Sequence, residues 1–123
     1  MAILLAIKPE FVEKILSGDK KFEFRKFIPK AKVDKIYIYA TRPVCRVVAV
    51  ADVLGVLSEC PEQLWILTKN NAGISRQFFD SYFAGRGMAY AYQLGNVVRF
   101  DVPKALSEFG VCAAPQSFVY IDK

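Results

Sequence analysis

Residues 18–26, Gly-Asp-Lys-Lys-Phe-Glu-Phe-Arg-Lys, combine residue types that could carry chemistry with a spacing that would bring them together. Side chains alternate between the two faces of a strand. The face that carries the two phenylalanines is expected to be buried, and the opposite face then aligns Lys21, Glu23 and Arg25. Such a row is either a solvated strand face or the floor of a site for an anionic ligand.

A lysine in this stretch could act as a general base. Its pKa, ordinarily about 10.4, would have to fall by several units through burial or a cationic neighbour. Arg25 would lower the pKa of a nearby lysine, whereas Glu23 would raise it by stabilising the ammonium. If the protein is an enzyme, Lys20, Lys21 and Glu23 are its candidate catalytic residues. The alternative is a structural ion pair in which Glu23 and Arg25 fix the mouth of a barrel.

The chain contains no histidine. This removes Ser-His and Cys-His nucleophile pairs, His-based metal sites and the usual general base near neutral pH. The three cysteines are odd in number, widely spaced and outside any C-x-x-C pair. Such a pattern argues against a disulfide scaffold and a zinc site, and is typical of small buried residues. We therefore expect no metal and no cofactor.

Positive charge is concentrated in the first part of the chain. Residues 1–46 carry eleven Lys and Arg against five Asp and Glu, a net charge of +6, whereas residues 47–123 carry six against seven, a net charge of −1. Asymmetry of this size suggests a polyanionic partner, here a nucleic acid or a nucleotide. The alternative is that the lysines only keep a small domain soluble.

The length of the chain fits one domain, and residues 1–123 are expected to form it. The apolar run at residues 2–7 is followed by Lys8-Pro9, and it is too short for a signal sequence or a membrane span. We interpret this run as a first strand, and we expect a cytoplasmic protein without membrane contact.

Hydrophobic periodicity, with Pro, Gly and Ser at the boundaries, predicts the remaining elements. The predicted strands are residues 2–7, 20–26, 35–41, 44–57, 88–94, 97–100 and 115–121, and the predicted helices are residues 9–17, 61–68 and 76–83, with an N-cap at Ser75 and a turn at Gly95-Asn96. Because the strands lack regular helical crossovers, we expect an α+β fold: a small antiparallel or mixed β-barrel flanked by about three helices. Phe78, Phe79, Tyr82 and Phe83 have helical spacing and are expected in the core.

The pattern Gly18-x-Lys20-x-x-Glu23-x-Arg25 resembles the G-x-K-x-x-E-x-R signature of the ASCH domain family, a branch of the PUA-like fold. Further stretches resemble small stand-alone members of that family: residues 2–9, 37–41, 61–65, 73–75, 79–85 and 115–118. The resemblance thus covers nearly the whole chain. It implies a PUA-like barrel beside a cleft that the signature residues line, and a role in binding RNA or acting on nucleotides.

The resemblance also implies two kinds of hydrolase. Some similar stand-alone proteins remove the acyl group of N4-acetylcytidine, with the signature lysine, a threonine at the position of Glu23 and a later glutamate implicated. Others are ribonucleases. In this chain the signature lysine is Lys20, and the threonine is replaced by Glu23.

Residues from several segments are candidates for contacting the ligand. Tyr39 could stack on a base, and Lys8 and Thr41 stand at strand ends, where polar groups collect around the mouth of a barrel. Gln116 and Ser117 could bond to a base edge or a phosphate, or equally to a buried backbone group. The candidate ligand-binding residues are Lys8, Lys20, Glu23, Arg25, Lys26, Tyr39, Thr41, Gln116 and Ser117.

These observations predict a domain that binds RNA or a nucleotide in a basic cleft beside the barrel. One alternative is a hydrolase that acts on RNA or on a modified nucleoside such as N4-acetylcytidine. Another is a protein-interaction module whose basic face meets an acidic protein.

Overall fold

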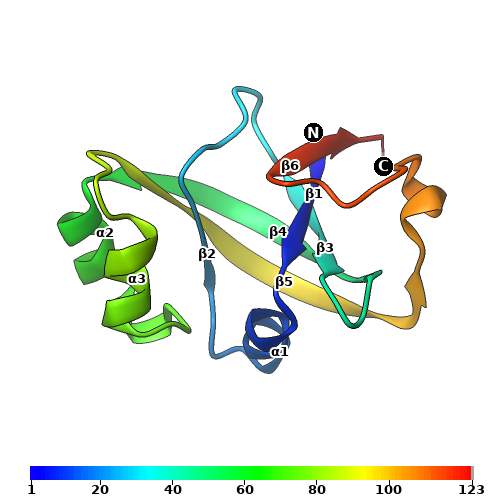
Figure 1. The fold of residues 1–123 in the computed structure, drawn as a ribbon, viewed down its shortest axis with the longest axis horizontal. Helices are drawn as coiled ribbons and strands as arrows, with labels where there is room; N and C mark the ends of the chain where they lie inside the picture. Colours follow the sequence, from blue (N-terminus) through cyan, green and yellow to red (C-terminus); the bar gives the residue numbers. More distant parts are fainter. Residues whose placement is uncertain (123) are drawn as a thin grey trace.

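The computed structural model describes residues 1–122, in which a long curved sheet carries helices at one end (Figure 1). The elements in chain order are β1 (Ala2–Ile7), α1 (Pro9–Ser17), β2 (Phe22–Arg25), β3 (Lys35–Ala40), β4 (Arg46–Glu59), α2 (Pro61–Thr68), the 3₁₀ turn η1 (Lys69–Asn71), α3 (Arg76–Tyr82), β5 (Ala89–Lys104), the 3₁₀ turn η2 (Leu106–Phe109) and β6 (Phe118–Ile121). The three predicted helices are therefore confirmed to within one residue.

Local signals set the helix boundaries. Pro9 and Pro61 each occupy the first turn of a helix, where a missing N–H costs nothing. Gly18 ends α1 with a φ of +89°, in the left-handed region that glycine enters most readily. The Oγ of Ser75 accepts a hydrogen bond of 3.0 Å from the backbone N–H of Phe78, which caps α3 as predicted.

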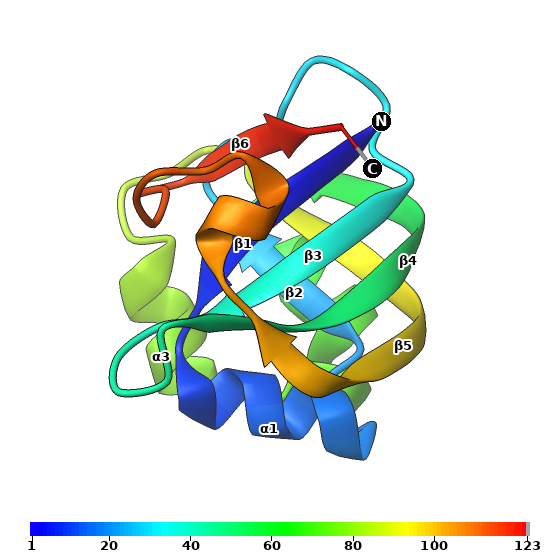
Figure 2. The same cartoon turned by 90° about the vertical axis from the view of Figure 1, so that its right-hand side faces the viewer.

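The six strands form one mixed sheet in the order β2-β5-β4-β3-β1-β6. Strands β1 and β3 are parallel, and every other neighbouring pair is antiparallel. The sheet curls so that β1 and β6 lie opposite β5 and β2, as an incomplete barrel (Figure 2). The predicted α+β architecture with a curled mixed sheet is confirmed.

Strand β4 lies two residues further along the chain than predicted, and strand β5 is longer than the sequence pattern predicted. The turn predicted at Gly95-Asn96 is wrong. Strand β5 runs through both residues without a break and pairs with β4 over most of its length. A side chain at Gly95 would lie 2.7 Å from Leu54 Cδ2, so this glycine permits close packing within the ribbon. The register of this pairing shifts between Val53 and Gly55.

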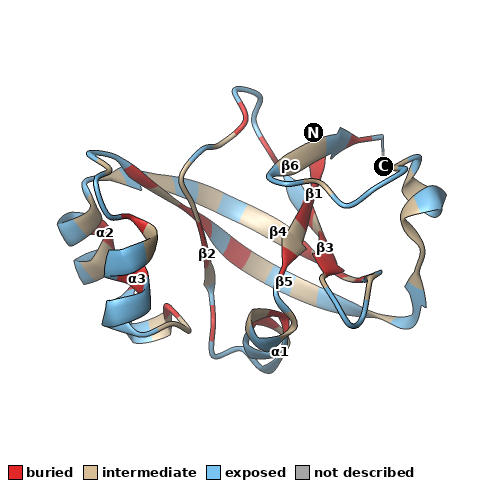
Figure 3. Ribbon diagram, in the orientation of Figure 1, coloured by how far each residue is buried: buried red, intermediate tan, exposed pale blue. Residues whose placement is uncertain are grey.

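The buried residues form separate clusters along this ribbon (Figure 3). A barrel core packs inside the curled sheet around Ile3, Leu5 and Ile38. A helical core packs α2 and α3 against the other end of the ribbon around Leu64 and Phe79. Strand β2 lies where the two meet, because Phe24 belongs to the helical core while its neighbour Glu23 is paired in the sheet with Tyr92, a residue of the barrel core. Among residues 1–122, no helix has the length and apolar character needed to cross a membrane.

Candidate functional site

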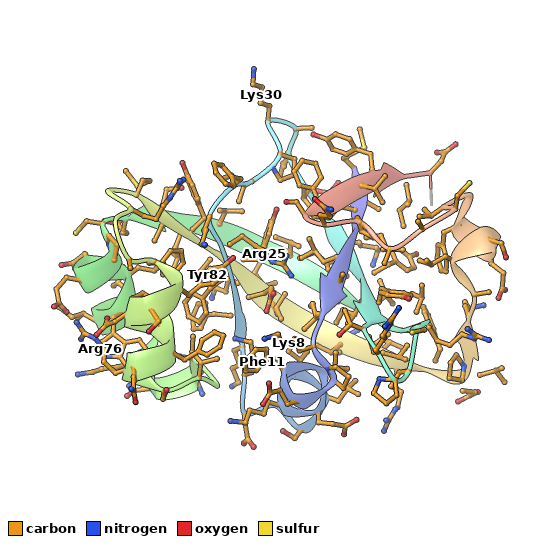
Figure 4. The ribbon with its side chains drawn as sticks, in the orientation of Figure 1. Lys8, Phe11, Arg25, Lys30, Arg76 and Tyr82 are labelled. Carbon is orange, nitrogen blue, oxygen red and sulfur yellow. The ribbon has the colours of Figure 1, made fainter. Side chains whose placement is uncertain are left out.

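A cleft of about 210 Å³ opens where β1, the start of α1, β2 and α3 come together. Its lining residues are Ala6, Ile7, Lys8, Phe11, Lys20, Glu23, Phe24, Arg25, Ile74, Phe78 and Tyr82. Figure 4 shows Lys8 and Phe11 near β1 and α1, with Arg25 and Tyr82 on either side of β2. The cleft therefore combines three signature residues with apolar and aromatic walls.

Lys20 is the most deeply buried charged group in the cleft, with 3% of its surface exposed. Its Nζ donates a hydrogen bond of 2.9 Å to the carbonyl of Ala72, and it lies 4.8 Å from the ring centre of Phe24 and 5.5 Å from that of Phe11. The stem of Lys20 packs directly on Gly73, whose φ is +69°. The segment before α3 thus holds the ammonium in one position.

The environment of Lys20 lowers its pKa from 10.5 to about 8. Burial is the main cause, because it penalises the charged form; Arg25 and Lys14 lower the pKa further, and Glu23 opposes them. At neutral pH a minority of molecules therefore carry a neutral amine at this position. This is the condition that a lysine general base requires.

Glu23 and Arg25 form an ion pair on the floor of the cleft. Arg25 donates from Nε and Nη2 to Glu23 Oε2 at 3.1 and 2.8 Å, and its Nη2 also donates to the carbonyl of Ala6 at 2.9 Å. Strand β6 pairs with β1 only from Ala2 to Leu5, so Ala6 lies beyond that pairing. Arg25 thereby ties the edge strand β2 to β1, which fits the structural role that the sequence left open for this pair.

The second carboxylate oxygen of Glu23 is placed differently. Oε1 lies 3.9 Å from Lys20 Nζ, which is too far for a hydrogen bond. Both bonds from Arg25 go to Oε2, so Oε1 is the oxygen with capacity for a donor on a ligand. The cleft floor thus offers one acceptor and one buried cation side by side.

Aromatic rings form the walls of the cleft. Phe78 and Tyr82 lie nearly parallel, with centroids 6.4 Å apart and 10° between planes, and Phe11 meets Phe78 edge to face at 5.3 Å. The prediction that the aromatic residues near α3 belong to the core is wrong for Phe78, which is 39% exposed. Phe79 and Phe83 are buried, and Tyr82 is half-buried and packs against the helical core.

Helix geometry explains this division. At 100° per residue, side chains four positions apart lie on nearly the same face, and adjacent ones do not. Phe78 and Tyr82 therefore form one pair facing the cleft, and Phe79 and Phe83 form another facing the helical core. The spacing contained this signal, because four aromatics at i, i+1, i+4 and i+5 cover two faces of a helix.

Two further lysines stand beside the aromatic walls. Lys8 lines the cleft, and its Nζ lies 6.0 Å from the ring centre of Phe78. The Nζ of Lys26 lies 4.8 Å from the ring centre of Tyr82. Lys8 directly follows the end of β1, and Lys26 directly follows the end of β2. One cation therefore lies beside each ring of the Phe78–Tyr82 pair.

The sequence placed Lys21 on one face with Glu23 and Arg25, but the structure puts Lys20 beside them instead. Both lysines precede β2, which begins at Phe22, so strand alternation does not govern them. The backbone N–H of Lys21 donates to the Asn71 carbonyl, and its exposed side chain lines a second hollow of about 470 Å³.

The remaining predicted ligand contacts lie outside the lining of the cleft. Tyr39 is 6% exposed and packs with Leu4 and Val47, and burial raises the pKa of its hydroxyl. The backbone N–H of Thr41 donates to the Ile7 carbonyl where β1 and β3 end. Gln116 and Ser117 are exposed in the segment before β6. Strand alternation places Tyr39 on the face of the sheet opposite Ile38, outside the barrel core.

Sequence reasoning missed Phe11, Ile74, Phe78 and Tyr82 as lining residues, and also the carbonyl of Ala72. A backbone carbonyl is present in every residue, so the residue type of Ala72 could not identify it as the acceptor for Lys20. Within residues 1–122, no group of three or more His, Cys, Asp or Glu side chains could hold a metal ion.

Comparison with known proteins gives one family. A family model described as "ASCH domain" matches residues 5–100. The ASCH domain-containing ribonuclease of Zymomonas mobilis is 36% identical over 92 residues, which is 74% of this chain and 62% of that protein. The ATP synthase subunit alpha of Ureaplasma parvum is 28% identical over 120 residues, 97% of this chain but 15% of that protein. The chain therefore spans less than two thirds of these relatives.

The fold is also similar to a solved structure. The crystal structure of ASCH from Zymomonas mobilis has a TM-score of 0.89 and 31% sequence identity, over 99% of this chain and 88% of that chain. The expected PUA-like architecture is thereby confirmed.

Proposed function

The chain belongs to the ASCH domain family, and from this membership we propose that it binds single-stranded RNA or a nucleotide in the cleft beside the barrel. One observation carries the proposal: a buried cation, a carboxylate with a free oxygen and two parallel rings line the same small space. An unpaired base combines a flat apolar face with a polar edge, and single-stranded RNA exposes such bases.

The size and walls of the cleft suit one base. Its volume of about 210 Å³ is below the roughly 300–1,000 Å³ of pockets for drug-sized ligands. Phe78, which is 39% exposed, offers a ring on which a base can stack. Stacking on one aromatic side chain stabilises binding by about 1–3 kcal/mol and tolerates any base.

The floor adds polar recognition. Glu23 Oε1 would accept a hydrogen bond from an exocyclic amino group, and the neighbouring Lys20 ammonium would donate to a ring nitrogen or carbonyl. Lys8 and Lys26, beside the rings, would contact phosphates. Bases that carry an amino group are therefore the expected preference.

Fluorescence anisotropy with labelled single-stranded RNA tests this proposal. Phe78→Ala should weaken binding about 5- to 100-fold through lost stacking, and Lys20→Met should weaken it through a lost donor. Arg76→Gln is the matched control, because Arg76 pairs with Glu62 and Asp80 on the far side of α3 (Figure 4). Binding should also fall steeply as salt rises. An unchanged affinity in Phe78→Ala, or no binding at low salt, would overturn the proposal.

RNA cleavage is the second candidate function. It is favoured by the lowered pKa of Lys20 and by the relative that is named a ribonuclease. In the proposed step the neutral Lys20 amine takes the proton of a ribose 2′-hydroxyl, whose oxygen attacks the adjacent phosphorus. The bond from phosphorus to the 5′-oxygen breaks, and that oxygen takes a proton from a water molecule. The hydroxide that remains takes the proton from the Lys20 ammonium, which restores water and the neutral amine. The products are a 2′,3′-cyclic phosphate and a 5′-hydroxyl.

Lys20→Arg separates cleavage from binding, because arginine keeps the positive charge but does not lose its proton. Gel analysis of end-labelled RNA should show cleavage that rises as pH increases toward about 8 in the native protein, as Lys20 loses its proton. The Lys20→Arg variant should retain RNA binding and lose cleavage. Cleavage that persists in this variant would exclude Lys20 as the base.

A further inference from the structure

An exposed aromatic ring stands just beyond the cleft. Phe27, the second residue after β2, is 62% exposed. The guanidinium carbon of Arg86 lies 4.5 Å from the centre of this ring. The Nη2 of Arg86 also donates a hydrogen bond of 3.2 Å to the carbonyl of Lys26. The loop that follows α3 therefore fixes the position of a ring that most domains would bury.

This ring continues the walls of the cleft. Lys26 precedes Phe27 directly, and its Nζ lies 4.8 Å from the ring centre of Tyr82, which lines the cleft. From the cleft outward the order is thus Tyr82, Lys26, then Phe27 with Arg86. Alternating rings and cations are what a single strand needs, because bases stack on the rings while cations meet the phosphates between them.

We propose that Phe27 and Arg86 form a second nucleotide subsite, which stacks the base next to the one held in the cleft. This inference rests on the proposed function and narrows it: the preferred ligand is a single-stranded segment of at least two nucleotides, and not a free nucleoside. The second subsite is expected to accept any base. It offers the ring of Phe27 for stacking and the guanidinium of Arg86 for a phosphate, and neither group distinguishes one base from another.

The charge around Phe27 favours RNA over an apolar partner. Arg86 lies against the ring, the neighbouring Lys26 places its ammonium over Tyr82, and Lys30 stands at the tip of the same loop (Figure 4). A hydrophobic protein patch would have to cover these cations, which is unfavourable unless acidic groups pair with them. A phosphodiester supplies that negative charge with every base that stacks.

Titrations with adenosine 5′-monophosphate and with the adenosine dinucleotide test the subsite. The native protein should bind the dinucleotide at least five-fold more tightly than the mononucleotide. Phe27→Ala should remove most of this gain and leave mononucleotide affinity within two-fold, whereas Phe27→Trp should keep the gain. Val102→Ala, which truncates another exposed apolar side chain, is the control and should behave as the native protein.

The outcomes separate the two proposals. If the native protein binds neither nucleotide nor longer RNA, the proposed function fails. If it binds both nucleotides alike, or if Phe27→Ala leaves the gain intact, the second subsite alone fails. Equal weakening of both nucleotides in Phe27→Ala also overturns the subsite, because it would place Phe27 in the support of the cleft. Since Phe27 is mostly exposed, unchanged thermal unfolding is expected for the variant.

Discussion

The cleft and the second hollow, which lie on either side of β2, differ in their charged residues in a way that their volumes do not show. The second hollow is about 470 Å³, more than twice the cleft's 210 Å³, and it contains the exposed Lys21. Lys20 lines both hollows, but Glu23 lines only the cleft. Both side chains are buried; the Lys20 ammonium is held by the Ala72 carbonyl, and the Glu23 carboxylate is held by Arg25 in the same strand. Desolvated charges are costly and persist only where the surrounding fold holds them. Buried charges with fixed partners are therefore a better reason than volume for choosing the cleft as the candidate functional site.

The first prediction removes the ion pair that defines the cleft. Glu23→Ala leaves Lys20 and Arg25 without their shared counter-charge in a poorly solvated place. We expect a loss of about 3–5 kcal/mol in the free energy of unfolding, measured by urea denaturation.

Lys21→Ala is the control for this comparison, and it should change stability by less than about 0.5 kcal/mol. Glu23→Gln should fall between the two variants, because the amide can still accept from Arg25. Equal effects of Glu23→Ala and Lys21→Ala would show that the two sides of β2 do not differ energetically.

The second prediction concerns pH. Folding lowers the pKa of Lys20 from 10.5 to about 8, so between these values the unfolded chain holds more protons than the folded one. Stability from this group therefore rises with pH across that window. The difference in unfolding free energy between the native protein and Lys20→Met should grow by about 3 kcal/mol from pH 7 to pH 11.

This difference also controls for other titrating groups. Burial raises the pKa of Tyr92 to about 12, so its contribution falls above the ordinary tyrosine pKa of about 10, but equally in both proteins. A difference that stays flat across the window would show that Lys20 is solvated in solution.

The third prediction displaces Lys20 without removing a chemical group. In Gly73→Ala the new methyl would overlap Lys20 Cβ and lie 2.6 Å from its Cγ. Gly85→Ala is the matched control, because its φ of +77° carries similar backbone strain while no atom lies within 4 Å of the new methyl.

Both glycine variants should lose about 1–2 kcal/mol from backbone strain, and Gly73→Ala should lose about 1 kcal/mol more. Only Gly73→Ala should also weaken RNA binding, as read by anisotropy. Matching stability and affinity in the two variants would contradict the close packing of Lys20 on this turn.

Much of the fold could be predicted because its signals are local. Proline at the start of a helix, Gly18 at the end of α1 and Ser75 before α3 act within a few residues, and the structure confirms each. The wrong turn at Gly95-Asn96 shows the limit. A glycine can permit either a turn or close packing between strands. Which of the two applies at Gly95 depends on its contact with Leu54 in the neighbouring strand.

The candidate site could be predicted only in part for the same reason. The signature placed Lys20, Glu23 and Arg25 together, but the burial of Lys20 depends on a carbonyl 52 residues away. The aromatic walls come from one face of a helix whose other face is core. Tyr39 is a residue type that could stack on a base, but in the folded sheet it is packed in a buried cluster with Leu4 and Val47. Tertiary contacts therefore determine which of these residues line the cleft.

The 52-residue separation between Lys20 and Ala72 also has a kinetic consequence. Residues 60–88 leave the ribbon after β4 and return at β5, and the cleft closes only when this segment docks on β2. Contacts so distant in sequence form late in folding, after loop closure has been achieved. A ligand that bridges β2 and α3 would hold the docked state by a free energy that grows with its concentration. Amide hydrogens in α3 would then exchange more slowly, while those of the barrel core would change little.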